Sequence, residues 1–260
     1  MKKILLRVFI PILAIILIIG YFGFIPGISN LFGSNRPKDL GIKYDSNDLE
    51  SAKKKTNINF IELNKNLQPI DSIKFSGQTS VKTQLSSQEL TALARELKWN
   101  YLPLRNITIK IDKDGYMETS SNLYGNKVME ALRAYNITPL TSQLPWSLFE
   151  IVYGAEGNEK VQQFYSTIDK ISKFLKSNPS FYTKGKAKII NNKITEFKIE
   201  AVYLGKLNIT GMVNNFNESI KSFIEDIITN TPGLYVKSLS FQDMKLNFDG
   251  TLPERISSSP

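Results

Sequence analysis

The chain of 260 residues contains neither cysteine nor histidine. This double absence excludes disulfides, zinc sites built from these residues, thiol nucleophiles and every mechanism that needs an imidazole base. The glycine-rich phosphate loops GxxxxGK(S/T) and GxGxxG are also missing, so nothing in the sequence supports nucleotide chemistry. No cofactor or metal is predicted, and the folded body must be stabilised by its core alone.

Charge and hydrophobic content are those of a folded protein with a mild basic excess. Hydrophobic residues make up 42% of the chain and charged residues 22%, which is sufficient for one core. The net charge is +9, and Lys2, Lys3 and Arg7 supply three of those charges. The remaining excess predicts weak attraction to anionic headgroups or wall polymers. The one dense basic run, residues 53–55, is typical of a solvated helix face, so nucleic acid is not expected as a partner.

An apolar run near the N-terminus predicts a membrane anchor. Residues 8–25 carry no charge, and at about 1.5 Å per residue they nearly cross a hydrocarbon layer of about 30 Å. Basic and no acidic residues precede the run, so the positive-inside rule places the N-terminus in the cytoplasm and the rest outside. We therefore expect residues 1–25 to form a cytoplasmic tip and the transmembrane helix of a single-pass cell-membrane protein. The alternative is a cleavable signal peptide, for which residues 27–29 (Gly-Ile-Ser) offer a small-x-small site.

Composition divides the rest of the chain into three parts. Residues 26–39 mix Pro, Gly, Ser and Asn and predict a short tether. Residues 40–253 are expected to form the exported domain, and residues 254–260 a disordered tail. Within the domain the hydrophobic period switches repeatedly between two and 3.6, which is typical of an α+β fold. The hairpin connections are too short for parallel crossovers, so we expect an antiparallel sheet of long hairpins packed with amphipathic helices.

Local signals place the elements of this fold. Ser86 and Glu89 form a capping box, which predicts a helix from about Ser87 to about Trp99. A strand is expected over residues 73–85. A short polar helix is expected at 45–55, where Ser46 or Asp48 can serve as the N-cap. Other helices are expected where apolar residues recur at helical spacing, at 128–135, 161–175 and 216–227. Alternating strands around polar turns predict three hairpins, at 107–123, 186–203 and 234–248.

Aromatic residues gather on and beside the expected helices in greater number than a layer of helices on a sheet needs. The ordinary interpretation is a packed core. The alternative is a groove or cavity that accepts an acyl chain or another apolar ligand. The residues expected to line it are Phe149, Tyr153, Phe164, Tyr165, Ile168, Phe216 and Phe223.

Catalytic patterns are weak. Without histidine only a Ser-Lys pair could serve a serine hydrolase; Ser51 and Lys54 have that spacing but lack the partner motifs, and we interpret them as coincidental. Glycoside hydrolysis needs two carboxyl groups about 5 to 9.5 Å apart, which sequence alone does not reveal. Most of the glutamates that could form such a pair are expected on the surface: Glu89, Glu96, Glu118, Glu150, Glu196 and Glu200.

Several segments carry a resemblance to known proteins. They are residues 40–44 (LGIKY), 85–93 (LSSQELTAL), 103–107 (PLRNI) leading to Asp114-Gly115, and 250–253 (GTLP). In these segments the exported body resembles a loose group of bacterial envelope proteins of unknown activity. More remotely, long hairpins around amphipathic helices are similar to tubular lipid-binding (TULIP-like) proteins of the bacterial envelope. This second resemblance implies a lipid-binding role but brings no ligand motif with it.

The sequence therefore favours a membrane-anchored, extracytoplasmic binding module for lipid or another apolar ligand, and not an enzyme. The first alternative is a structural or adaptor protein that contacts wall polymer or another envelope protein through an exposed sheet edge and basic residues. The second alternative is a carboxylate-dependent hydrolase, which requires two acidic residues that converge in a cleft.

Overall fold

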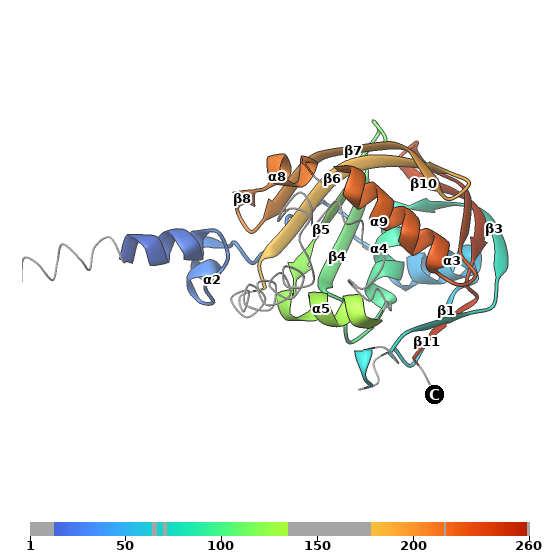
Figure 1. Ribbon diagram of the computed structural model, residues 1–260, viewed down its shortest axis with the longest axis horizontal. Helices are drawn as coiled ribbons and strands as arrows, with labels where there is room; N and C mark the ends of the chain where they lie inside the picture. Colours follow the sequence, from blue (N-terminus) through green and yellow to red (C-terminus); the bar gives the residue numbers. More distant parts are fainter. Residues whose placement is uncertain (1–12, 64–66, 70–71, 135–177, 216, 259–260) are drawn as a thin grey trace, which may run out of the picture.

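An eight-stranded, curled antiparallel sheet is the largest element of this α+β fold (Figure 1). The computed structural model describes residues 13–63, 67–69, 72–134, 178–215 and 217–258. The strands follow the order β3, β10, β9, β6, β5 and β4, with β7 on the other side of β6 and β8 beside β7. Their bounds are β3 Thr79–Ser86, β4 Leu104–Ile111, β5 Met117–Leu123, β6 Ser180–Ile190, β7 Lys193–Leu204, β8 Leu207–Asn208, β9 Tyr235–Gln242 and β10 Lys245–Leu252.

The three predicted hairpins are confirmed as β4–β5, β6–β7 and β9–β10. Asn191 and Asn192 both have positive φ in the β6–β7 turn, as a tight hairpin turn requires. In the β4–β5 turn, one Asp112 carboxylate oxygen accepts hydrogen bonds from two backbone N–H groups. β6 is long enough to pair with β5 along residues 180–185 and with β9 at residues 189–190. This hairpin therefore joins the two halves of the sheet.

Helix α4 (Ser87–Glu96) lies between the two edge strands, β3 and β4. It begins at the predicted capping box, in which Ser86 and Glu89 bond to each other's backbone N–H groups. The Thr91 hydroxyl accepts from the N–H of Ile109 at 2.9 Å and donates to its carbonyl at 3.1 Å. The helix thus satisfies backbone groups of edge strand β4 that would otherwise be open to pairing with another chain.

A second, three-stranded sheet is formed by β1 (Asn59–Ile61), β11 (Arg255–Ser257) and β2 (Lys74–Ser76), with β11 in the centre. Residues 255–257 were expected in a disordered tail but pair with two strands instead. The strand expected over 73–85 is divided between the two sheets, because Gly77 turns the chain with φ of +73°. Trp99 is buried in the apolar cluster at this sheet and donates to Ser72 at 2.9 Å.

Helix α9 (Asn217–Asn230) covers the apolar face of the large sheet and confirms the helix predicted at 216–227. Ile224 and Ile228 pack there with buried residues of five strands. The helices α3 (Ser46–Thr56) and α5 (Gly125–Ala134) match two further predictions. The helix predicted at 161–175 lies outside the described residues.

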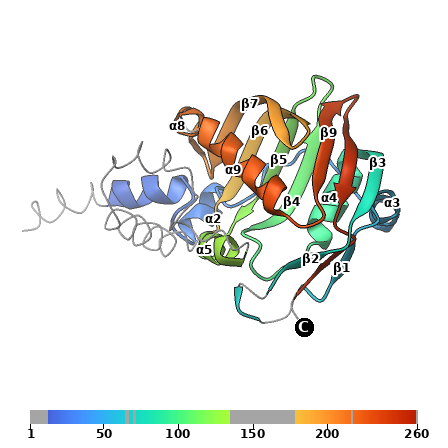
Figure 2. The ribbon, with the colours of Figure 1, turned by 45° about the vertical axis from the view of Figure 1, so that its right-hand side comes forward.

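The described chain begins with a helical stretch over residues 13–21, here called the N-terminal helix, which projects from the body (Figures 1 and 2). A short helix, α2 (Ile28–Phe32), follows it. Two more short elements, β8 and the helix α8 (Thr210–Asn214), lie at the same end of the body. Within the described part of the chain, no helix has the length and apolar character needed to cross a bilayer.

Candidate functional site

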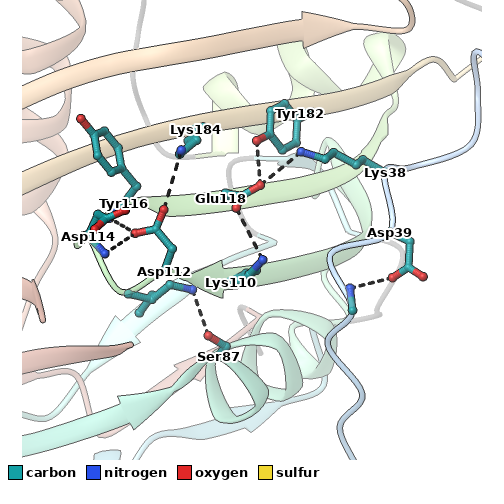
Figure 3. A network of polar contacts seen from close by, with 12 residues as sticks. Lys38, Asp39, Ser87, Lys110, Asp112, Asp114, Tyr116, Glu118, Tyr182 and Lys184 are labelled. Atoms are coloured by element: carbon teal, nitrogen blue, oxygen red, sulfur yellow. Dashed lines mark hydrogen bonds and ion pairs between the residues drawn. The ribbon is translucent and has the colours of Figure 1, made fainter. Parts of the chain in front are cut away.

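Four side chains on the polar face of the large sheet form a cluster that we call the clamp: Lys38, Lys110, Glu118 and Tyr182 (Figure 3). Its centre is the buried carboxylate of Glu118. This carboxylate accepts hydrogen bonds from the Tyr182 hydroxyl at 2.7 Å and from the Lys38 ammonium group at 3.3 Å. The Lys110 ammonium group lies 3.8 Å from the other carboxylate oxygen. The Lys38 ammonium group also lies 4.0 Å from the centre of the Tyr182 ring.

Strand pairing brings the clamp together. Glu118 is the partner of Lys110 in β4 on one side and of Lys184 in β6 on the other. Paired residues of an antiparallel sheet point to the same face, so these side chains share one face. Tyr182 belongs to the same face because it lies two residues from Lys184 along β6. The next pair, Thr183 and Val202, points to the opposite face, where α9 packs.

Electrostatics in the clamp favour an ionised carboxylate. Burial raises the pKa of Glu118, but hydrogen bonds from Tyr182 and Lys38 and the positive charges of the lysines outweigh burial and hold this pKa below its ordinary value. Burial and the hydrogen bond to Glu118 raise the pKa of Tyr182 well above the ordinary tyrosine value. Both groups therefore keep one protonation state through the physiological range, which suits them to binding and positioning rather than proton transfer.

The polar face continues beyond the clamp as alternating charges. Lys184 lies 3.0 Å from Glu200 and 3.7 Å from Asp112. The Tyr116 ring has three ammonium groups within 4.8 to 5.6 Å of its centre, and the Lys198 ammonium group donates to its hydroxyl at 3.0 Å. The lysines around Tyr116 are Lys184, Lys186 and Lys198. Beyond the clamp, this face thus combines the Tyr116 ring with charges of both signs.

The clamp holds the chain segment that follows α2. Residues 34–44, which we call the strap, run along β5 in the opposite direction: the Asn35 carbonyl accepts from Asn122 at 2.6 Å, and Lys38 reaches Glu118. Beyond this point Leu40 is buried, and the Tyr44 ring lies 5.2 Å from the Arg95 guanidinium group of α4. Much of the segment expected to be a tether therefore packs on the body.

The strap begins at a tight junction between the N-terminal helix and the sheet, here called the base. The Ser34 carbonyl accepts hydrogen bonds from both the N–H and the hydroxyl of Ser180, each at 3.0 Å. The Ser34 hydroxyl donates to the Tyr21 carbonyl. At Gly205, φ is +59° and an added Cβ would lie 2.0 Å from the Phe22 carbonyl oxygen. Only glycine allows this close approach of two backbone segments. The base therefore fixes the N-terminal helix against β6 and β7.

The predicted apolar site is only partly described. Phe149, Tyr153, Phe164, Tyr165, Ile168 and Phe216 lie outside the described residues. Phe223 lies on α9 and is half-buried.

The structure also places most of the glutamates and the Ser51–Lys54 pair that the sequence singled out. Surface positions were expected for most of the six glutamates. Glu196 and Glu200 are exposed as expected, whereas Glu89 and Glu118 are buried. For the Ser-Lys spacing, the structure shows that the Ser51 hydroxyl donates a hydrogen bond to the Glu89 carboxylate at 2.5 Å. Among the described residues, no group of three or more acidic side chains is placed to hold a metal ion.

Sequence reasoning missed the clamp because its members come from four separate segments. The signal available was the unbroken polar run over residues 118–122 of β5, in which Glu118, Ser120 and Asn122 point to the same face and are all buried. Such a pattern indicates a polar layer that another part of the chain must satisfy. Comparison with known proteins gives no match to a protein-family model, to a curated protein or to a solved structure.

Proposed function

We propose that the chain is a single-pass, membrane-anchored binding module whose body lies outside the cytoplasm. The observation that carries the proposal is the N-terminal helix (residues 13–21), from here on called the anchor helix, which projects from the body and exposes large apolar side chains. They are Leu13, Ile15, Ile16, Leu17, Ile18, Ile19 and Tyr21. Burying apolar area is worth about 25 cal/mol per Å², so such a helix is far more stable in hydrocarbon than in water. Residues 8–12 extend the same apolar run toward the basic tip.

The positive-inside rule orients this anchor. Lys2, Lys3 and Arg7 precede the apolar run, and the first acidic residue of the chain is Asp39. The base and the strap then connect the anchor to the sheet through a continuous series of hydrogen bonds. The body is accordingly held in one orientation at the outer face of the membrane, and its polar face and α9 are presented at fixed positions.

A lipid or another apolar ligand is the proposed occupant of the module. Support comes from α9, which carries two apolar stripes: Ile224 and Ile228 pack into the core, whereas Ile220, Phe223 and Ile227 are half-buried. A second stripe at helical spacing exceeds what one sheet face requires. The resemblance to TULIP-like proteins agrees with this ligand class as an analogy of fold.

Topology is tested with single cysteines, which the cysteine-free chain makes unambiguous. Asp243→Cys places a thiol in the β9–β10 turn, and Lys2→Cys places one in the basic tip. In intact cells an impermeant maleimide is expected to label residue 243 and to label residue 2 only after lysis. Labelling of residue 2 alone, or recovery of the full chain in the soluble fraction, contradicts the anchor.

The ligand is tested by native mass spectrometry of the full chain released from mild detergent. Bound lipid is expected on the wild type and is expected to decrease in Phe223→Ser, because a hydroxyl replaces a ring in the half-buried stripe. Met244→Ser is the matched control, since Met244 is exposed in the β9–β10 turn. A wild-type chain free of lipid contradicts the ligand class and leaves the anchor unaffected.

An adaptor that contacts wall polymer is the second candidate function. The specific observation in its favour is the open polar face, where Tyr116 lies among three lysines and acidic side chains. An aromatic ring bordered by charged groups suits a polar, extended polymer. Binding of purified wall polymer that is lost in Tyr116→Ala and kept in Phe223→Ser favours the adaptor over the lipid module.

A further inference from the structure

The end of the body beside the anchor helix exposes apolar side chains. Leu31 on α2 is 78% exposed, and Met212 on α8 is 63% exposed. Both short helices lie at the end of the body from which the anchor helix projects (Figures 1 and 2). Isolated exposed apolar residues are common, but these two lie on separate segments at one end of the protein.

The two described segments that form this end contain no acidic residue in their sequence. Residues 13–38 and residues 201–217, which contain α2, β8 and α8, include no Asp or Glu. They do include the exposed Arg36 and Lys206, and the Lys206 ammonium group lies 4.7 Å from the centre of the Tyr21 ring at the end of the anchor helix. Basic side chains next to exposed apolar side chains are suited to contact with an anionic lipid surface.

The base determines where this surface lies relative to the anchor. Gly23 packs against Pro179 and Ser34, and Gly205 packs against the Phe22 carbonyl, so the last turn of the anchor helix is in contact with the sheet. A helix embedded in the bilayer up to Tyr21 therefore brings α2 and α8 to the headgroup region. No flexible linker separates the described anchor helix from α2, because Ser29 donates to the carbonyls of Gly20 and Ile25.

We infer that the basal surface, defined as Leu31, Arg36, Lys206 and Met212, rests on the outer leaflet of the membrane. Leu31 and Met212 enter the interface between headgroups and acyl chains, and Lys206 and Arg36 contact lipid phosphates. A second copy of this chain is a poorer occupant, because the surface carries positive charge only and would repel itself. The inference rests on the proposed membrane anchor and adds the contact that fixes the body on the bilayer.

The test uses the full chain in nanodiscs that hold one copy each, with single nitroxide labels. Leu31→Cys and Met212→Cys report on the basal surface, Leu17→Cys on the anchor helix, and Met244→Cys is the matched control. Met244 is 60% exposed, similar to Met212, but lies in the β9–β10 turn away from α2. Collision with membrane-soluble oxygen and with an aqueous nickel chelate is measured at each label.

The expected result is a severalfold higher ratio of oxygen to nickel collisions at residues 31 and 212 than at residue 244. Lys206→Glu is expected to lower that ratio at residue 212 when the nanodisc contains phosphatidylglycerol, whereas Lys245→Glu leaves it unchanged. If residue 17 is in hydrocarbon but residues 31 and 212 match residue 244, the inference is overturned and the anchor stands. If residue 17 itself is in water, the anchor and the inference both fail.

Discussion

Two buried glutamates hold the N-terminal part of the chain on the body, and they do so in different ways. Glu89 lies at the start of α4. Its carboxylate accepts hydrogen bonds from the backbone N–H of Ser86 and from the side chains of Ser51 and Lys55 of α3. Glu118 lies inside β5 and takes all its described partners from other elements. Both carboxylates are ionised. Glu89 is positioned by local helix capping, whereas Glu118 is positioned by long-range strand pairing.

The two glutamates attach different parts of the N-terminal segment to the body. Glu89 joins α3 to α4, two helices that lie next to each other at the edge of the sheet. Glu118 joins the strap to the sheet and so connects the proposed anchor to the body. Loss of the first carboxylate should loosen a helix pair, and loss of the second should free the strap.

The largest effect is expected from removal of either carboxylate. Glu118→Ala leaves the buried Tyr182 hydroxyl without its acceptor, and Glu89→Ala removes the carboxylate that accepts from Ser51, Lys55 and the Ser86 N–H. For each variant the free energy of unfolding is expected to fall by about 2 to 3 kcal/mol in urea titrations of the full chain in detergent. Hydrogen exchange should then differ by location: faster in residues 34–40 for Glu118→Ala and faster in α3 for Glu89→Ala.

Glu196→Ala is the control for this pair, because Glu196 forms an ion pair with Lys186 on the open polar face. No measurable change in stability is expected, since an exposed ion pair contributes little. Equal exchange in the strap and in α3 for both buried-site variants would show that the two carboxylates do not have separate tasks.

A smaller effect is expected from the hydroxyl partner of each carboxylate. Tyr182→Phe removes the donor to Glu118 but keeps the ring that faces Lys38, and should cost about 1 to 2 kcal/mol. Ser51→Ala removes the corresponding donor to Glu89 and should cost about 1 kcal/mol, because Lys55 and Ser86 still bond to that carboxylate. Urea titration measures both; a larger cost for Ser51→Ala than for Tyr182→Phe would reverse this ranking.

The same contrast explains how much could be predicted from sequence. The start of α4 was predictable because Ser86 and Glu89 are three residues apart and the capping box is a local pattern. The hairpins were predictable because turn residues such as Asn191 and Asn192 lie between alternating strands. The burial of Glu118 was not predictable, because it depends on Lys38 and Tyr182, which are 80 and 64 residues away.

The segments predicted as a tether and a disordered tail differ from the structure for the same reason. The polar composition around Arg36 is typical of a linker, but Ser180 and Asn122 supply the hydrogen bonds that place the strap on the sheet. Residues 255–257 carry no strong strand signal, and pairing with β1 and β2 makes them a strand. Local composition does not reveal partners that are 87 residues (Asn122) and 146 residues (Ser180) away along the chain.

Acid is expected to weaken both attachments through one mechanism. The pKa values of Glu118 and Glu89 lie below their ordinary value of 4.5 in the folded protein, where hydrogen bonds and lysine charges outweigh the effect of burial. Below about pH 4.5 the unfolded chain therefore binds more protons than the folded one. The stability that these groups contribute is complete above about pH 4.5 and is lost as the pH falls through their folded-state pKa values.

Urea titrations between pH 6 and about pH 3 test this expectation. The double variant Glu118→Gln, Glu89→Gln should lose less stability on acidification than the wild type, because neither position can take up a proton. Each single variant should lie between the two. A wild type and a double variant with parallel pH profiles would show that other carboxyl groups control the acid response.

The smallest effect is expected from the lysines, which are partly exposed. Lys38→Met and Lys55→Met each remove one charge beside a buried carboxylate that keeps other donors, and should cost less than about 1 kcal/mol. The two should nevertheless differ in kind. Lys38 also lies over the Tyr182 ring and comes from the strap itself, so Lys38→Met is expected to speed hydrogen exchange in residues 34–40. Added salt should reproduce that faster exchange in the wild type, because it screens the exposed lysine.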